Sequence, residues 1–322
     1  MSGATPSVLV VGEALTDVVI TSAGEITEVP GGSPMNVAVT LGRWGHAVEF
    51  HTAIGNDSRG ALIEEHLRES GVALSASSRS LSRTSTAVAR LSEGGVAEYE
   101  FDIRWDPEPL TAARADYVHT GSIAVFVEPG CWTVRDLLAA HRPTSVITLD
   151  PNVRPSLLSG ARTAARERFE GLLDVTDVVK LSDEDAAWLY PDLEPVAVAR
   201  RLHDFGVHVV ALTRGAEGSE LSSPGTMVQV APLVVPVVDT IGAGDAYMGA
   251  LIAGLIRHGI GAEDLRGGEQ LSPALLHEVG TFAAHVAGST VSRRGADPPW
   301  IDHEAGIRSR ERLCGSGARS AE

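Results

Sequence analysis

The chain contains, at residues 239–246, the stretch DTIGAGDA, and this stretch decides the fold class. An apolar run at residues 234–238 precedes it, and apolar residues at helical spacing follow it from Tyr247 to Ile256. A glycine-rich turn therefore joins the end of a predicted strand to the start of a predicted helix. Small residues let backbone N–H groups approach an anion, and a helix N-terminus adds positive partial charge. The stretch predicts an anion site in an α/β protein.

Asp245 stands at the start of this predicted helix. A carboxylate in that position is often only a helix cap. A cap explains Asp245 but does not explain Gly242, Ala243 and Gly244 before it. We therefore interpret Asp245 as a catalytic residue beside an anion site.

A second motif, GGSPMNVA, occupies residues 31–38. Two glycines before a helix permit a tight backbone near a ligand, and the Asn36 amide can bond to hydroxyl groups. Taken alone, the motif is ordinary helix-start chemistry, because proline is favoured in the first turn. Asp17 lies shortly before it, after Gly12 and Glu13.

Together, the two motifs resemble the signatures of the ribokinase/PfkB carbohydrate kinases, in that family's order. The resemblance covers residues 1–301. It implies an α/β fold with a central, mostly parallel sheet flanked by helices and a small β-strand lid. It also implies that Asp245 is the base that deprotonates a sugar hydroxyl, while the amides of residues 242–244 stabilise the transferring phosphoryl group. Such a reaction requires mainly positioning and charge stabilisation from the protein.

The resemblance further implies the ligands and their sites. ATP is the expected phosphoryl donor, Mg²⁺ the expected metal, and Asp239 a candidate for a monovalent cation such as K⁺. The candidate sugar-binding residues of the two motifs are Asp17, Gly31, Gly32 and Asn36.

A third motif, DPNVR at residues 150–154, closes an apolar strand. One interpretation is a turn with a surface arginine. The other follows from its similarity to fructokinase-like and 2-keto-3-deoxygluconate kinase-like members of the family, which places Asn152 and Arg154 near the phosphate path or the substrate. Arg154 could then offset charge on the γ-phosphate.

Two further segments are candidates for the nucleotide side. At residues 180–185 the family usually has Asn-x-x-Glu, whereas this chain has Lys180, Ser182, Glu184 and Asp185. Glu184 and Asp185 are candidates to hold Mg²⁺ through water, and Lys180 and Ser182 to contact the nucleotide, although a capped helix start explains the pattern equally well. At residues 213–218 the turn resembles the family's nucleotide-side loop, with Thr213, Gly215 and Gly218 facing ATP.

Strands alternate with helices along most of the chain, which predicts a parallel sheet. Strands are expected at residues 8–11, 48–54, 117–120, 145–150, 177–181, 207–213 and 234–238, with helices at about 36–43 and 60–70. The expected lid segments are residues 13–32 and 84–106. The polar tail at residues 302–322 is expected to be a short surface helix followed by disorder.

Composition excludes several classes of protein. The formal net charge of -16 disfavours nucleic acid and anionic membranes as partners. The two cysteines form no disulfide framework, and Lys180 is the only lysine. We find no signal peptide and no apolar run of about 18 residues, so a cytoplasmic protein without a membrane span is expected.

The resemblance to these kinases implies ATP-dependent phosphorylation of a sugar primary hydroxyl, with fructose as the expected substrate. An acidic sugar such as 2-keto-3-deoxygluconate is an alternative, because Arg90 and Arg104 on the lid could bind its carboxylate, although both could equally be solvated. A nucleoside is the third alternative for the substrate. A hypothesis of a different class is a protein that binds sugar or nucleotide as a sensor and catalyses no reaction. The lid strands could also pair two chains into a homodimer.

Overall fold

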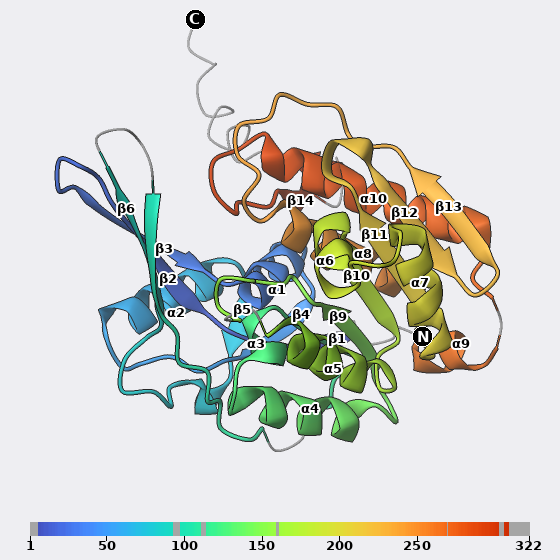
Figure 1. Cartoon of the computed structure of the whole chain (residues 1–322), viewed down its shortest axis with the longest axis horizontal. Coiled ribbons are helices and arrows are strands. Elements are labelled where there is room, and N and C mark those ends of the chain that lie inside the picture. The colour runs from blue at the N-terminus through green and yellow to red at the C-terminus, as the bar shows by residue number, and fades with distance from the viewer. Residues whose placement is uncertain are drawn as a thin grey trace, which may run out of the picture.

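A computed structural model of the chain shows a large sheet between two layers of helices and a smaller sheet that stands away from them (Figure 1). The residues that the structure describes are 6–92, 97–110, 114–158, 161–268, 270–302 and 306–308.

The main sheet has nine strands, and all neighbouring pairs from β5 to β11 are parallel. In their order across the sheet they are β13 (Thr226–Val230), β12 (Ser219–Ser223), β11 (Val209–Thr213), β10 (Val178–Ser182), β9 (Val146–Asp150), β8 (Tyr117–Gly121), β1 (Ser7–Val11), β4 (Ala47–His51) and β5 (Val72–Leu74). β12 and β13 add an antiparallel edge. The predicted α/β architecture is confirmed.

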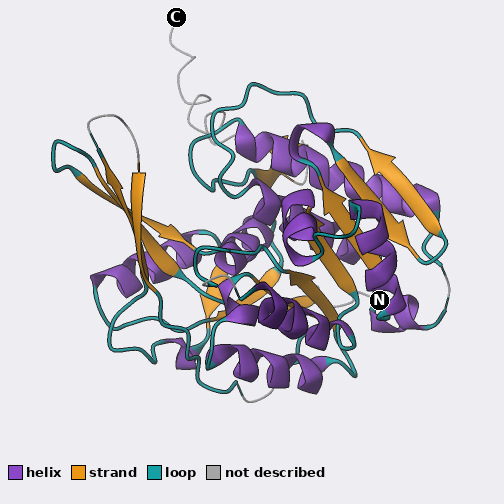
Figure 2. Ribbon diagram, in the orientation of Figure 1, coloured by secondary structure: helices purple, strands orange, loops and turns teal. Residues whose placement is uncertain are grey.

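Helices cover both faces of this sheet (Figure 2). One face carries α1 (Ser33–Arg43), α2 (Ser58–Glu69), α8 (Ala243–Arg257), α9 (Ala262–Arg266) and α10 (Pro273–Val291). The other carries α3 (Ile123–Phe126), α4 (Gly130–His141), α5 (Arg162–Leu173), α6 (Asp183–Leu189) and α7 (Pro195–Asp204). Successive side chains of β1 enter alternate cores, which explains its continuous apolar sequence. Within the described ranges, no helix is both long and apolar enough to cross a membrane.

The smaller sheet is the lid that the sequence predicts. Its order is β3 (Ile26–Gly31), β2 (Leu15–Ile20), β6 (Thr86–Leu91) and β7 (Ala97–Asp102). β6 and β7 pair antiparallel within the second predicted lid segment, residues 84–106, of which residues 93–96 lie outside the described residues. Figure 1 shows this sheet projecting from one side of the main body.

The strand predicted at residues 234–238 is wrong. This segment is a loop, and Val234 and Val237 are 91% and 67% exposed. The antiparallel strands β12 and β13, which the pattern did not predict, already complete this edge of the sheet, and Pro236 removes a backbone donor within the run. The apolar residues of the loop line a cleft instead of filling a core.

The described part of the tail also differs from the prediction. β14 (Trp300–Asp302) pairs with β15 (Gly306–Arg308) in an antiparallel hairpin, so the surface helix expected after residue 302 is wrong for these residues. The rest of the predicted tail lies outside the described residues.

Close packing of α1 against α8 fixes the relative positions of the two motif-bearing helices. At Gly249 an added Cβ would lie 2.7 Å from the Cβ of Thr40 and 3.3 Å from the carbonyl oxygen of Val37. A glycine in mid-helix is unfavourable by itself, so its presence here reflects the short distance between the helices.

We expect Gly249→Ala to lower the free energy of unfolding by about 1–3 kcal/mol, because the new methyl group overpacks this contact. Gly171→Ala is the matched control: nothing lies within 4 Å of its added Cβ in α5, so helix propensity should stabilise it by about 0.5–1 kcal/mol. Urea unfolding measures both. An equal gain in stability for the two variants would contradict the packing described.

Candidate active site

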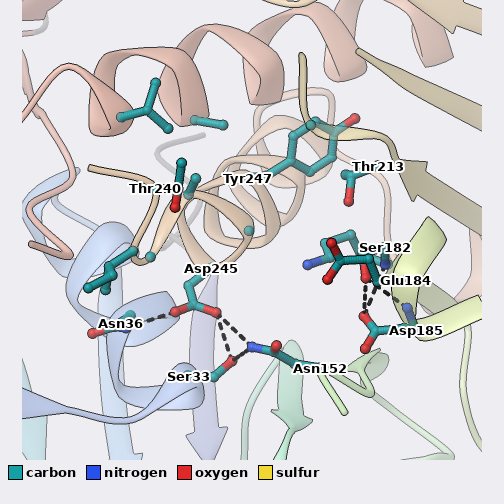
Figure 3. Close-up of a pocket in the computed structure, with 18 of the residues that line it drawn as sticks. Ser33, Asn36, Asn152, Ser182, Glu184, Asp185, Thr213, Thr240, Asp245 and Tyr247 are labelled. Atoms are coloured by element: carbon teal, nitrogen blue, oxygen red, sulfur yellow. Dashed lines mark hydrogen bonds between the residues drawn. The ribbon is translucent and has the colours of Figure 1, made fainter. Parts of the chain in front are cut away.

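A cleft of about 840 Å³ opens at the carboxyl ends of the parallel strands, between the main body and the lid. Asp150, Ser182 and Thr213 end β9, β10 and β11 at this edge. Ligand sites in open α/β sheets form at this edge. The start of α1 and the start of α8 also line the cleft (Figure 3).

The glycine-rich turn lies in this cleft and leads into α8. Gly242 is the N-cap and has φ of 75°, a left-handed conformation in which an added Cβ would lie 2.5 Å from the Cβ of Ala296. Only glycine fits there without strain. The helix then begins at Ala243, so the backbone N–H groups of its first turn have no partner within the helix. The N–H of Ala243 donates to the carbonyl oxygen of Thr240 at 3.3 Å, outside the helix. A helix start of this kind favours an anion in the cleft.

Asp245 lies in the first turn of α8 and is only 6% exposed. Its Oδ1 accepts hydrogen bonds from Ser33 Oγ at 2.7 Å and from Asn152 Nδ2 at 3.2 Å. Its Oδ2 accepts one from Asn36 Nδ2 at 2.7 Å. Figure 3 shows the three donors converging on the carboxylate from α1 and from the loop after β9. A helix cap alone does not explain a carboxylate that accepts hydrogen bonds from three side chains of other segments.

Lys180 lies beneath the same turn. Its Nζ would be 3.0 Å from a Cβ placed on Gly244, and it pairs with the fully buried Asp150 at 2.7 Å. Burial lowers the pKa of Lys180, but the carboxylates of Asp150, Asp185 and Asp245 outweigh burial and raise it above its ordinary value. The only lysine of the chain is therefore a buried ammonium beneath the anion site.

Ser182 and Asp185 form a reciprocal capping box at the start of α6. Asp185 Oδ2 accepts from the Ser182 hydroxyl at 2.7 Å, and its Oδ1 accepts from the backbone N–H of Val153 at 2.8 Å. Oδ1 therefore holds the loop after β9 against α6, while Oδ2 completes the cap of α6 itself. The neighbouring Glu184 is exposed and lines the cleft. Among the described residues, no three acidic, histidine or cysteine side chains meet as a ready metal cluster.

The nucleotide-side loop and an apolar wall line the far part of the cleft. Thr213, Gly215 and Gly218 line it, and both glycines have positive φ. The wall consists of side chains from the loop after β13 and from α10, namely Leu233, Val234, Val235, Val237, Ile241, Ala284, Ala287 and Val291. The exposed valines of the loop are part of this wall, which offers an apolar surface to a ligand.

Most sequence-predicted site residues meet in this cleft. Those that line it are Asp17, Gly32, Asn36, Arg154, Lys180, Ser182, Glu184, Asp185, Thr213, Gly215, Gly218, Gly242, Ala243, Gly244 and Asp245. Four do not. Arg90 and Arg104 lie 3.8 Å from Glu100 and Asp102 on the lid. Gly31 lies behind Asp17, and Asp239 holds the backbone N–H groups of Ile241 and Gly295.

Sequence reasoning missed Ser33 and Glu13. Ser33 belongs to the motif at residues 31–38, where its side chain was taken for helix-start chemistry. Glu13 lines the cleft at 4% exposure and accepts a hydrogen bond from the backbone N–H of Ala124 at 3.1 Å. Burial raises the pKa of Glu13 from 4.5 to about 7 against the lowering effects of Ser122, Ala124 and Arg154. The available signal for Glu13 was that a charged residue closely follows the apolar strand at residues 8–11.

Comparison with known proteins agrees with this geometry. The family model described as "pfkB family carbohydrate kinase" matches residues 5–303. The chain belongs to this family. Among pfkB relatives, a fructokinase of Rhizobium leguminosarum bv. trifolii is 31% identical over 259 residues, which are 77% of this chain and 79% of that protein.

Solved structures of pfkB kinases show the same fold. The ATP-bound fructokinase of Xylella fastidiosa superposes with a TM-score of 0.79 at 23% identity, covering 91% of this chain and 94% of the other. A double mutant of the Vibrio cholerae O395 fructokinase, with fructose, ADP and a potassium ion bound, gives 0.77 at 24% identity and covers 92% and 95%.

We expect Glu13→Gln to change how stability depends on pH. Because folding raises the pKa of Glu13, its contribution to wild-type stability is fully present below about pH 4.5 and is lost as the pH rises through about 7. Glutamine keeps the size and an acceptor for Ala124 but cannot ionise. The free energy of unfolding of the variant relative to wild type should therefore rise from pH 5 to pH 8, by up to about 3 kcal/mol. Urea unfolding at both pH values measures this. A difference in free energy of unfolding between variant and wild type that stays constant would contradict the prediction.

Proposed function

We propose that this pfkB kinase transfers the γ-phosphoryl group of ATP to a primary hydroxyl of fructose. One observation carries the proposal: a buried, hydrogen-bonded Asp245 lies in the first turn of α8, directly after the glycine-rich turn, in a cleft large enough for a sugar and a nucleotide. The relatives named above are fructokinases.

In the proposed reaction, the sugar hydroxyl oxygen attacks the γ-phosphorus while the bond to the bridging oxygen of ADP breaks. Asp245 accepts the hydroxyl proton. The backbone amides of Gly242, Ala243 and Gly244 hold the transferring group, because all three residues line the cleft at a helix N-terminus, where N–H dipoles stabilise an anion. The N–H of Ala243 exchanges its 3.3 Å bond to the carbonyl oxygen of Thr240 for a phosphoryl oxygen. Such transition states are loose, so positioning contributes more than the strength of the base.

The sugar occupies the lid side of the cleft. Asp17, Gly32 and Asn36 contact its hydroxyl groups, and Gly31 leaves room for Asp17, since an added Cβ would lie 2.2 Å from its Oδ2. Arg154 adds positive charge close to Asp17 and helps to offset charge on the phosphoryl group.

The charges at this end favour a neutral sugar over an acidic one. Among the described arginines, only Arg154 lines the cleft beside Asp17 and Asp245, whereas Arg90 and Arg104 lie 3.8 Å from Glu100 and Asp102 on the lid. A sugar carboxylate would meet like charges, which disfavour binding. This supports fructose over 2-keto-3-deoxygluconate.

ATP occupies the opposite side. Its base packs on the apolar wall next to Thr213, Gly215 and Gly218, and its phosphates lie over Lys180 and Ser182. Glu184 would hold Mg²⁺ through water, because Asp185 is already occupied by two backbone N–H groups and a hydroxyl. When bound, the ion neutralises phosphate charge. Asp239, which orders the turn, remains our candidate for a K⁺ site.

We also propose a homodimer through the lid. β3 is an edge strand, and its Ile26 and Val29 are 64% and 47% exposed. An exposed apolar edge invites a second copy. Analytical ultracentrifugation tests this, and a monomer at micromolar concentration would contradict it.

The cytoplasmic location stays a prediction.

We expect Asp245→Asn to lower kcat by about a thousandfold, because the amide cannot accept the hydroxyl proton. ATP binding by isothermal titration calorimetry and the unfolding midpoint should stay close to wild type. Turnover at the wild-type rate would remove Asp245 from the mechanism.

A coupled ADP-release assay on fructose, 2-keto-3-deoxygluconate, ribose and adenosine tests the substrate. We expect the largest kcat/KM for fructose, because the sugar end of the cleft is acidic. Preference for 2-keto-3-deoxygluconate would contradict the charge argument. Binding of sugar and ATP without release of ADP would instead indicate a sensor.

A further inference from the structure

The hydroxyl of Ser33 lies between Asp245 of α8 and Asn152 of the loop after β9. Ser33 Oγ donates to Asp245 Oδ1 at 2.7 Å and accepts from Asn152 Nδ2, also at 2.7 Å. The side chain is buried, with 6% exposure. Three segments far apart in sequence therefore meet at this one hydroxyl (Figure 3).

Helix capping does not explain this arrangement. The N-cap of α1 is Gly32, with φ of 125°, and Ser33 is already the first helical residue. No side chain caps this helix end. The hydroxyl has one proton to donate, and the amide nitrogen of Asn152 can only donate, so the serine proton must point to the carboxylate.

The direction of these bonds leaves few acceptor positions on Asp245. Each carboxylate oxygen has two lone-pair positions. Ser33 and Asn152 take both positions on Oδ1, and Asn36 takes one on Oδ2. One position on Oδ2 remains for a hydroxyl that approaches from the cleft.

We propose that Ser33 is a positioning residue for proton transfer: by occupying Oδ1 it assigns the base function to Oδ2 of Asp245. This inference rests on the proposed function. The sugar proton goes to the remaining Oδ2 lone pair as the new P–O bond forms and the bond to ADP breaks. Ser33 keeps its proton throughout, and its hydrogen bond favours the ionised carboxylate before transfer.

The surroundings hold the serine in this role. Asn152 is one of two described residues other than glycine with positive φ, at 32°, and its backbone N–H donates to Asp150 Oδ1 at 3.2 Å. Asp150 in turn pairs with Lys180. The side chain that donates to Ser33 is thus fixed by the buried ion pair beneath the anion site.

The test is the split between kcat and KM with fructose for Ser33→Ala, Ser33→Cys and Ser33→Thr. We expect kcat to fall about 5- to 20-fold in Ser33→Ala, because Oδ1 is then no longer occupied and competes with Oδ2 for the sugar hydroxyl. The KM for ATP should be unchanged. Ser33→Cys, which keeps the volume but is a weak donor, should behave like alanine. Ser33→Thr, which keeps the hydroxyl, should restore kcat.

Thr176→Val is the matched control. Thr176 is fully buried, does not line the cleft, and its hydroxyl donates to the backbone carbonyl of Leu172 at 2.7 Å. The control should keep the wild-type kcat and KM. A wild-type kcat for both Ser33→Ala and Ser33→Cys, or an equal loss of kcat in Thr176→Val, would overturn the role of Ser33. If wild type itself does not phosphorylate any of the sugars, the proposed function fails, which is a separate outcome.

Discussion

The contact between α1 and α8 is the constraint on which the candidate active site depends. The two helices approach closely at Gly249, and their first turns therefore lie side by side at the carboxyl edge of the sheet. This geometry brings Ser33 and Asn36 within hydrogen-bond distance of Asp245, a residue more than two hundred positions later in the chain. The buried carboxylate keeps its orientation because three side-chain donors, from α1 and from the loop after β9, bond to it.

Charge balance is the second constraint. Three carboxylates, those of Asp150, Asp185 and Asp245, act on the single buried ammonium of Lys180. The floor of the cleft therefore has little positive charge to spare for the phosphates of a nucleotide. In the proposed reaction, the backbone amides of the glycine-rich turn and a divalent cation must carry that charge. These groups act where charge develops, which is the main electrostatic contribution to phosphoryl transfer.

Local patterns predicted the parts of the structure that depend on local chemistry. The glycine-rich turn before Asp245 requires positive φ at Gly242, and strand–helix alternation predicted the parallel sheet. Contacts between segments that are far apart in the sequence could not be predicted from local patterns. Nothing near Ser33 in the sequence indicates that its hydroxyl meets Asp245, and the valines at residues 234–238 have strand composition although they line a cleft. Arg90 stays on the lid because acids there satisfy it.

The most direct test of the account is a crystal structure of the protein with fructose and a non-hydrolysable ATP analogue. The account predicts a primary hydroxyl within hydrogen-bond distance of Asp245 Oδ2 and in line with the γ-phosphorus, whose oxygens accept from the amides of residues 242–244. A nucleotide bound away from that turn, or a sugar whose hydroxyl groups do not approach Asp245, would contradict it.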